Sequence, residues 1–382
     1  MESYKLGKIV KVFNGKTPKK SEHKKKGFPV LKIKDFSNAG FFLGTYGTYI
    51  ENSVAQNNIG RVLQEGDIIV LNSAHHTDYV ASKIGFITDE NAGALPVGEW
   101  TIFRTTSKEI NNKYLYYYIK SQKFKNFLRK ITKGGHLYPT DIRKYTIQLP
   151  KIKDQIEIAN KLTIASNMLK KRKDLILNNN ILLNNLFLKI FGNPFNIKSS
   201  SKVKISEIIR QDKIKFNKKK NKLIRYLSLR DIEANSGKIK ESNNKNEISV
   251  KSGTYKFNES HILYGKLRPY LNKVATPNFN GHCSTELVPY LIINPRFTKE
   301  YLVSFLRSNL FVNIANESSR GARMPRTNLR YIENLRIKIP DKKKLDLFSN
   351  CYNKILNIDH LYQKSQKLLF LLEFNLLNNY LS

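Results

Sequence analysis

The stretch "KGGHLYPTDIRKYTIQLP" (Lys133–Pro150) has a counterpart in "RGARMPRTNLRYIENLRIKIP" (Arg320–Pro340). Each passes from a glycine through a basic loop to a strand-like apolar run, then to a proline and a lysine-rich segment with a helical pattern. Two pairs of residues are 187 apart, namely Gly134 and Gly321 (321 − 134), and Thr140 and Thr327 (327 − 140). A fixed spacing of this kind indicates an internal repeat.

Four further pairs of blocks follow the same order in both halves of the chain. They are Lys5–Lys20 with Lys204–Lys220, Phe28–Phe36 with Ile224–Ile232, Glu65–Ala74 with Glu259–Arg268, and Asn112–Phe124 with Lys299–Phe311. Alternating runs such as "PVLKIKDF" and "YLSLRDI" predict half-buried strands, and the block "YLYYYIKSQKF" predicts a helix. The sequence therefore predicts two tandem α/β domains in a chain of the α+β class.

A long segment without glycine or proline follows each domain and has apolar residues at alternating steps of three and four. In the first segment this seam comprises Leu162, Ala165, Leu169, Arg172, Ile176, Asn179, Leu183, Leu186 and Ile190. In the second it comprises Cys351, Ile355, Ile358, Tyr362, Ser365, Leu369, Leu372 and Leu376. Such seams are typical of coiled coils, in which polar members fix the register. Two long helices that each lie on their own domain are the alternative.

The predicted architecture is two domains separated by an antiparallel coiled coil of the two long helices, with pseudo-twofold symmetry. The first helix is expected to end at "FGNPF", since glycine and proline stop helices. The predicted boundaries are 1–150 for the first domain, 151–192 for the first long helix, 193–338 for the second domain and 339–382 for the second long helix.

The charge of the chain indicates a polyanionic partner. Its 382 residues include 67 Lys and Arg against 30 Asp and Glu, a net charge of +37. Basic surfaces of this strength are the electrostatic footprint of nucleic-acid binding. Ribosomal and membrane-surface contacts are the alternatives. Cys283 and Cys351 have no metal-ligand spacing, and the first residues lack the apolar run of a signal peptide, so a cytoplasmic protein without a metal site is expected.

Three places in each copy are candidate nucleic-acid contacts, because lysine and arginine bind phosphates and arginine also reads guanine. The lysine runs before the first core strand are Lys24, Lys25, Lys26 and Lys218, Lys219, Lys220. The ends of a central strand carry His75 and His76 in one copy, and Lys266 and Arg268 in the other. The glycine-containing basic loops carry Lys133 and His136, and Arg320, Arg323 and Arg326. Solvated loops, internal salt bridges and a domain-to-helix hinge are the respective alternatives.

Two motifs resemble the specificity subunit of Type I restriction-modification systems. They are "ILYGKLRPYLNKVA" (Ile262–Ala275) and "GHCSTELVPY" (Gly281–Tyr290). In that family two target-recognition domains are each followed by a long helix, and the helices pair antiparallel. The family's helix start is retained in part in "LPKIKDQIEIANKL" (Leu149–Leu162), with Pro150 and Gln155, whereas the second helix start keeps only Pro340.

The resemblance implies a non-catalytic subunit that selects a bipartite site in double-stranded DNA, each domain reading one half. It implies that the helices fix the spacing and dock methyltransferase subunits, and that ATP-dependent translocase and restriction subunits join the complex. The interface residues of the helices would be Leu162, Leu169, Ile176, Leu183, Leu186, Ile355, Ile358, Tyr362, Leu369 and Leu372. No cofactor is expected in this chain, since S-adenosylmethionine, ATP and Mg²⁺ would be bound by the partners.

Two other functions are compatible with a basic, duplicated chain. A stand-alone methyltransferase or nuclease would need catalytic motifs, but the sequence has no GxxxxGK[ST] phosphate loop, and "GNPF" (Gly192–Phe195) lacks a second proline for an adenine-flipping motif. A structural RNA-binding protein would not need two stiffly separated modules. The sequence therefore favours a DNA-recognition subunit.

Overall fold

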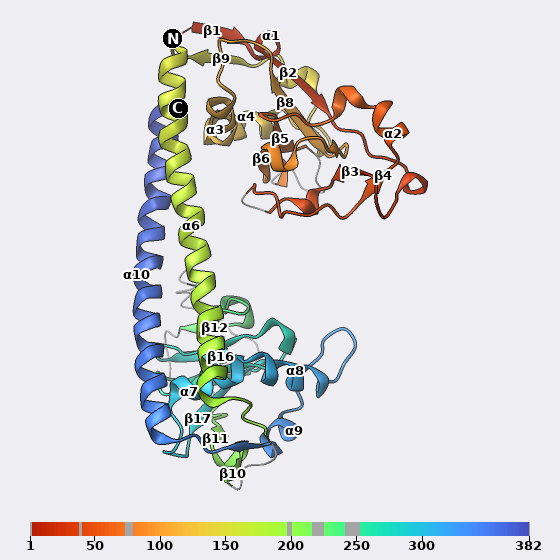
Figure 1. Ribbon diagram of the computed structural model, residues 1–382. Helices are drawn as coiled ribbons and strands as arrows, with labels where there is room; N and C mark the ends of the chain where they lie inside the picture. Colours follow the sequence, from red (N-terminus) through yellow and green to blue (C-terminus); the bar gives the residue numbers. More distant parts are fainter. Residues whose placement is uncertain are drawn as a thin grey trace. The chain divides into compact units, whose positions relative to one another are not determined.

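The computed structural model describes residues 2–37, 40–72, 79–196, 201–215, 225–240 and 253–381. The chain forms two compact units, Met1–Lys171 with Gln366–Ser382 (unit 1) and Arg172–Ser365 (unit 2). Both units combine helices with sheets, which confirms the predicted α+β class. The two long helices, α6 (Ile152–Phe191) and α10 (Lys342–Leu381), contribute residues to both units (Figure 1).

Unit 1 contains a four-stranded antiparallel sheet of order β2-β8-β5-β6. Its strands are β2 (Val10–Asn14), β8 (Trp100–Thr105), β5 (Ile68–Leu71) and β6 (Ile84–Phe86). A three-stranded sheet consists of β3 (Phe28–Leu31) between β4 (Tyr49–Ile50) and the parallel β7 (Leu95–Pro96). The short strands β1 (Glu2–Lys5) and β9 (Thr146–Leu149) pair antiparallel. All four residues of β5 are buried, as its uninterrupted apolar sequence requires.

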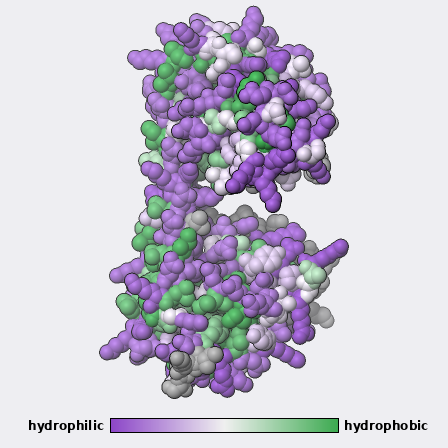
Figure 2. All heavy atoms as spheres, turned by 45° about the vertical axis from the view of Figure 1, so that its right-hand side comes forward, coloured by the Kyte–Doolittle hydropathy of each residue, from purple (hydrophilic) through white to green (hydrophobic). Residues whose placement is uncertain are grey.

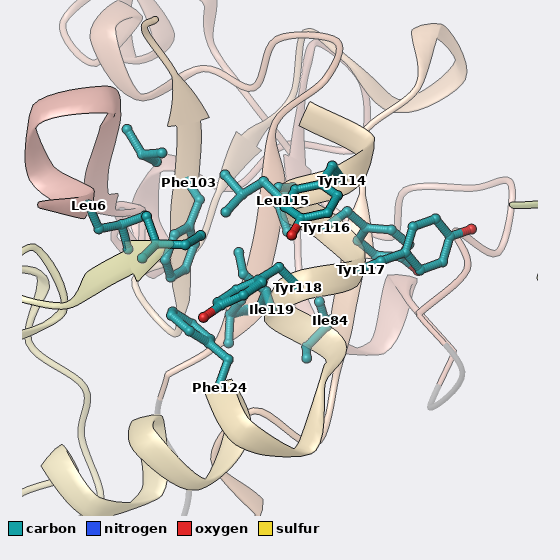
Figure 3. Packing of buried hydrophobic residues seen from close by; sticks show 14 of the residues in the cluster. Leu6, Ile84, Phe103, Tyr114, Leu115, Tyr116, Tyr117, Tyr118, Ile119 and Phe124 are labelled. Carbon is teal, nitrogen blue, oxygen red and sulfur yellow. The ribbon is translucent and has the colours of Figure 1, made fainter. Parts of the chain in front are cut away.

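The helices of unit 1 are α1 (Leu6–Ile9), α2 (Asn52–Gln56), α3 (Asn112–Lys120), α4 (Gln122–Ile131) and α5 (Pro139–Ile142). The predicted single helix over "YLYYYIKSQKF" is instead two helices, α3 and α4. They are separated at Ser121, whose hydroxyl accepts the backbone N–H of Phe124 at 3.3 Å and so begins a new helix. Tyr118 and Phe124 then meet edge to face in the core, 5.7 Å apart (Figure 3).

Unit 2 repeats this construction. Its four-stranded antiparallel sheet has the order β11-β17-β14-β15, with β11 (Ile209–Gln211), β17 (Leu287–Ile292), β14 (Ile262–Gly265) and β15 (Val274–Ala275). In its three-stranded sheet, β16 (Gly281–Ser284) lies between two strands. It pairs parallel with β12 (Tyr226–Leu227) and antiparallel with β13 (Thr254–Phe257). Strands β10 (Lys202–Lys204) and β18 (Arg336–Lys338) pair antiparallel. The helices are α7 (Lys299–Arg307), α8 (Asn309–Glu317) and α9 (Leu329–Asn334).

The match of Thr140 with Thr327 is wrong. The helices α3 and α7 do begin 187 residues apart (299 − 112), but the later elements are 190 apart. Ile147 of β9 and Ile337 of β18 occupy the same place in their strand pairs (337 − 147), and α6 and α10 begin at residues 152 and 342 (342 − 152). Because the spacing changes between these elements, three additional residues lie in the connecting loop of unit 2.

The predicted strand over "PVLKIKDF" is also shorter than expected. Strand β3 ends at Leu31, and a 3₁₀ turn, η2 (Ile33–Asp35), follows it. The Asp35 carboxylate accepts the backbone N–H of Lys32 at 2.7 Å and closes this turn. In unit 2 Asp231 closes the turn η7 (Leu229–Asp231) through the backbone N–H of Ser228, also at 2.7 Å. A capping carboxylate therefore ends the strand in both copies, since it gives the backbone another partner.

The long helices are in contact within each unit. In unit 1, Leu162 of α6 and Leu381 of α10 belong to one buried cluster. In unit 2, Phe187 of α6 packs on Phe348 of α10, with ring centroids 5.8 Å apart. In each unit, therefore, the first part of one long helix lies beside the last part of the other.

The predicted seam of α10 is wrong at Ile358 and Leu372, which are 42% and 48% exposed. The neighbouring acidic residues, Asp359 and Glu373, face inward instead. Asp359 accepts a hydrogen bond from Asn179 Nδ2 at 2.6 Å. A pattern of apolar residues cannot reveal a seam position that is held by a paired acid. Of the other predicted interface residues, Leu162 and Leu183 are buried, and Leu169, Ile176, Leu186, Ile355, Tyr362 and Leu369 are partly buried.

Apolar side chains are exposed on parts of both long helices. On α6 they include Ile156, Ile164 and Met168, and on α10 they include Leu368, Phe370 and Phe374. Elsewhere the visible surface is mostly hydrophilic (Figure 2). Across the described ranges, no helix has the length and hydropathy needed to cross a membrane.

Candidate nucleic-acid interface

Two of the predicted contact segments of unit 2 meet at the end of β14. After Gly265 the chain passes through Lys266 and Arg268 into the 3₁₀ turn η9 (Pro269–Leu271). The carbonyl of Lys266 accepts the backbone N–H of Thr327 at 2.9 Å, and the backbone N–H of Arg268 donates to the carbonyl of Pro325 at 2.7 Å. Residues more than 50 positions apart in the sequence thus form one basic surface.

We call Gly321–Pro325 the arginine loop, because Arg320 and Arg326 close it. The backbones of these two arginines exchange hydrogen bonds of 3.1 and 3.0 Å. Gly321 has a φ of +102°, a conformation that residues with a side chain rarely adopt. Five residues therefore project from a closed base, in the connection between α8 and α9 (Figure 1).

The arginines of this surface have different surroundings. The guanidinium of Arg326 donates to the Glu286 carboxylate through Nε at 3.1 and 3.2 Å and through Nη2 at 2.8 Å. This bidentate pair raises the pKa of Arg326 and occupies its hydrogen-bonding edge. The side chains of Arg320 and Arg323 are exposed, and neither has an ion-pair partner among the described residues. Arg320 and Arg323 are thus the cations available to a ligand, whereas Arg326 holds the loop.

Arg268 is held in a strained backbone conformation. Its φ of +54° and ψ of +66° are left-handed, and it directly precedes Pro269, which disfavours helical conformations of either hand. A left-handed residue with a side chain costs about 1–2 kcal/mol. Hydrogen bonds from Leu271 to its carbonyl, at 2.9 Å, and from its own N–H to Pro325 hold the backbone in place. Its side chain is exposed, and strain of this kind is concentrated at functional sites.

A hollow lies at the base of the arginine loop. It is lined by Arg320, Asn328, Tyr331 and the last residues of α8 with those that follow, Glu317, Ser318 and Ser319. Asn328 begins α9 by accepting the backbone N–H of Tyr331 at 3.2 Å. The rings of Tyr331 and of Tyr270 in η9 are about half exposed. Exposed aromatic rings beside cations are suited to stacking on nucleotides.

Unit 1 has a shorter loop at the corresponding place. We call Gly134–Gly135 the glycine loop; Lys133 and His136 close it through two backbone hydrogen bonds of 3.0 Å. Both glycines have positive φ, +57° and +78°, as a two-residue type I′ hairpin requires. The next residue, Leu137, donates its N–H to the carbonyl of Asn72 at 3.0 Å. This bond is the equivalent of the Thr327–Lys266 bond of unit 2.

The cationic side chains beside the glycine loop are exposed. Lys133 Nζ lies 2.9 Å from the Asp141 carboxylate, which also pairs with Lys144 at 3.0 Å. The two lysines lower the pKa of Asp141. Because these groups are on the surface, the pairs contribute little to stability and can exchange for a phosphate. His136 is exposed as well.

The remaining predicted contacts lie in loops. Lys24, Lys25 and Lys26 are exposed before β3, and Lys24 Nζ forms an ion pair with Glu51 at 2.7 Å, which lowers the pKa of Glu51. His75, His76, Lys218, Lys219 and Lys220 are outside the described residues. The structure thus brings the central-strand and loop candidates together in unit 2, while the described lysine run of unit 1 belongs to a separate loop.

Gln155 fixes the start of α6 in unit 1. Its side chain is buried, accepts the backbone N–H of Asn111 at 2.9 Å and donates to the carbonyls of Glu109 and Pro150 at 2.8 and 2.9 Å. These bonds join the start of α6 to the start of α3. In unit 2 the corresponding residue is Leu345 (155 + 190), which is buried in the core. The two helix starts are therefore held by different interactions.

Two positioning residues are absent from the sequence prediction. Lys120, the last residue of α3, lies 3.8 Å from the Glu373 carboxylate of α10. Arg307, the last residue of α7, donates to Asn180 Oδ1 of α6 at 3.0 Å and to the carbonyl of Asn235. Both residues join a domain helix to a long helix. Their spacing of 187 (307 − 120) within matched blocks is the sequence signal that identifies them.

The described residues include few groups with the arrangement or pKa that catalysis requires. Among the described residues, no group of three or more His, Cys, Asp and Glu side chains is arranged to hold a metal ion. Burial raises the pKa of Cys283 to about 12, so its thiol is protonated at neutral pH and is a poor nucleophile.

Comparison with known proteins gives a family match for the first part of the chain. Residues 1–179 match the family described as the Type I restriction modification DNA specificity domain. A stretch of 115 residues is 28% identical to the specificity subunit of the Type I restriction enzyme EcoDI from Escherichia coli, and it covers 30% of this chain. The match spans 25% of the length of that relative.

Solved structures show the same fold over almost the whole chain. The S subunit of a Type I restriction-modification system from M. genitalium is 14% identical, with a TM-score of 0.56 over 98% of this chain and 94% of that one. A chain from a structure of the type I R-M system, solved to explain its complex assembly and conformational transition, is 13% identical, with a TM-score of 0.54 over 99% and 96%. The predicted resemblance to Type I specificity subunits is therefore confirmed.

Proposed function

We propose that this chain is the DNA sequence-specificity subunit of a Type I restriction-modification complex. Units 1 and 2 would contain tandem target-recognition domains, each reading one half of a bipartite site in duplex DNA. The observation that carries the proposal is the basic surface of unit 2, where Lys266, Arg268, Arg320 and Arg323 gather on two hydrogen-bonded loops. The equivalent backbone bonds around the glycine loop support a corresponding surface in unit 1.

The long helices would form an antiparallel coiled coil with pseudo-twofold symmetry and fix the spacing of the half-sites. Three observations support this part of the proposal. Each helix is 40 residues long, the two helices pack together within each unit, and Asn179 and Asp359 form a polar pair that specifies register. The exposed apolar side chains of α6 and α10 would dock methyltransferase subunits.

In this proposal the chain itself makes and breaks no covalent bonds. S-adenosylmethionine, ATP and Mg²⁺ would be bound by the methyltransferase and by the ATP-dependent translocase and restriction subunits. The chain would contribute the choice of site. Its net charge of +37 favours rapid, salt-dependent association with duplex DNA before a specific site is reached.

The test is a selection of duplex DNA from a randomised pool by the full chain together with its methyltransferase subunits. We expect two conserved short sequences separated by a spacer of fixed length. Arg323→Ala is expected to weaken binding of all sequences and to reduce the salt slope of log K by about 1, because one phosphate contact is lost.

Three outcomes would contradict the proposal. Recovery of a single continuous sequence would exclude recognition of two separate half-sites by units 1 and 2. Tighter binding of structured RNA than of duplex DNA in competition would favour an RNA-binding protein. Methylation or cleavage of DNA by the isolated chain with S-adenosylmethionine or Mg²⁺ would favour a stand-alone enzyme.

A further inference from the structure

The arginine loop carries an exposed apolar side chain. Met324 is 47% exposed and is followed by Pro325, so two apolar residues lie between Arg323 and Arg326. An exposed methionine is common on protein surfaces when it is isolated. Here it lies on a loop that projects from a closed base within a basic surface, which places it where a polyanion would be bound.

The loop is ordered before any ligand binds. Its base is closed by the Arg320–Arg326 hydrogen bonds, and the Pro325 carbonyl accepts the N–H of Arg268 at 2.7 Å. Glu286 holds Arg326 through three contacts of 2.8 to 3.2 Å. At Gly321 a β-carbon would lie 3.1 Å from the Met324 carbonyl, so the loop turns tightly there. A loop held in this way loses little conformational entropy when it binds a ligand.

We propose that Met324 is a wedge that enters the minor groove and opens one base step of the half-site bound by unit 2. Proteins that bend DNA insert methionine, proline, leucine or phenylalanine between base steps, and their arginine and lysine side chains contact the minor groove. Met324 and Pro325 supply the apolar element, and the exposed Arg320 and Arg323 supply the cations. This inference rests on the proposed DNA-binding function.

The glycine loop of unit 1 has no equivalent of this element. The glycine loop has two residues without side chains between Lys133 and His136. Deformation of the DNA is therefore expected in one half-site only. Because pyrimidine–purine steps unstack at the lowest cost, we expect a TA or CA step at the wedge position of that half-site.

The experiment uses the full chain with its methyltransferase subunits and the duplex recovered by selection, with 2-aminopurine replacing each adenine in turn. Unstacking of 2-aminopurine increases its fluorescence. In the wild-type complex we expect the increase at one step of one half-site. Met324→Ala should abolish it and weaken binding about three- to tenfold without changing the salt slope, since no charge is removed. Met324→Leu should preserve it.

Ile293 provides a control. It is an apolar residue of similar exposure, 46%, directly after β17 in unit 2 and outside both loops and both long helices. Ile293→Ala should leave the 2-aminopurine signal unchanged. The wedge is excluded if Met324→Ala gives the wild-type signal, or if the bound wild-type complex gives no signal at any position. If wild-type protein selects no duplex sequence, it is instead the proposed DNA-binding function that fails.

Discussion

The glycine loop of unit 1 and the arginine loop of unit 2 occupy the same place in two similar frameworks. Each is closed by a mutual pair of backbone hydrogen bonds, and the chain just after each loop donates to the end of a central strand, at Asn72 or Lys266. Between these shared bonds one loop has two glycines and the other has five residues with an exposed methionine and arginine. The comparison teaches that the backbone hydrogen bonds around a loop can be retained while the loop itself changes in length, charge and shape.

The largest difference in stability is expected at the helix starts. Gln155→Leu would leave the backbone N–H of Asn111 and the carbonyls of Glu109 and Pro150 without their partner. A buried polar group without a partner costs about 1–3 kcal/mol, so a loss of about 3 kcal/mol is expected. Chemical denaturation followed by circular dichroism measures it.

The matched variant in unit 2 is Leu345→Gln, which places an amide among apolar side chains and should destabilise by a similar amount. If either exchange left the free energy of unfolding unchanged, the two helix starts would be interchangeable, and the contrast between their interactions would have no energetic basis.

A smaller effect, of opposite sign for stability and binding, is expected at Arg268. Arg268→Gly relieves the left-handed strain and should stabilise the protein by about 0.5–1 kcal/mol, after allowance for the greater freedom of glycine in the unfolded chain. The same change removes an exposed guanidinium from the basic surface and should weaken binding of the selected duplex about tenfold or more.

Thermal unfolding and a binding titration of the same preparation measure both effects. Arg268→Lys is the control, since it keeps a charge but loses the bidentate geometry of arginine. An Arg268→Gly protein that is more stable and binds DNA as well as wild type would show that the strain has no role in recognition.

The smallest expected effect is a pH-dependent change in stability, and it arises at Asp359 in the seam of α10. Burial raises the pKa of Asp359, and this exceeds the opposing effects of the Asn179 hydrogen bond and of Arg307 and Lys238. A raised carboxyl pKa in the folded state means that ionisation of Asp359 opposes folding, so its contribution to stability is lost as pH rises through the folded-state pKa.

Asp359→Asn should therefore stabilise unit 2 at pH 7, with an advantage that shrinks as the pH falls through the raised folded-state pKa and is lost below the ordinary carboxyl pKa of about 4. Urea denaturation at several pH values checks this. Leu169 is the corresponding seam residue of α6 (359 − 190), and Leu169→Ile should give a pH-independent change. A pH-independent effect of Asp359→Asn would mean that the carboxylate does not titrate with folding.

The sequence by itself determined the features that depend on local pattern and composition. The order of matched blocks predicted the repeat, apolar residues at alternating steps of three and four predicted the long helices, and the charge predicted a polyanionic ligand. The resemblance to the family's helix start marked the beginning of α6 at Pro150 and Gln155. These signals are readable since each depends on neighbours within a few turns or on the total count of charges.

Only the tertiary structure decided which distant residues meet. It showed that the spacing of matched residues increases from 187 to 190 after the glycine and arginine loops. It also showed that Asp359, rather than Ile358, lies in the seam of α10. It gave Arg326 a carboxylate partner, while Arg268 was forced into a left-handed conformation by bonds to Pro325. Such outcomes depend on backbone and side-chain partners far apart in the chain, and no local pattern of apolar and charged residues specifies them.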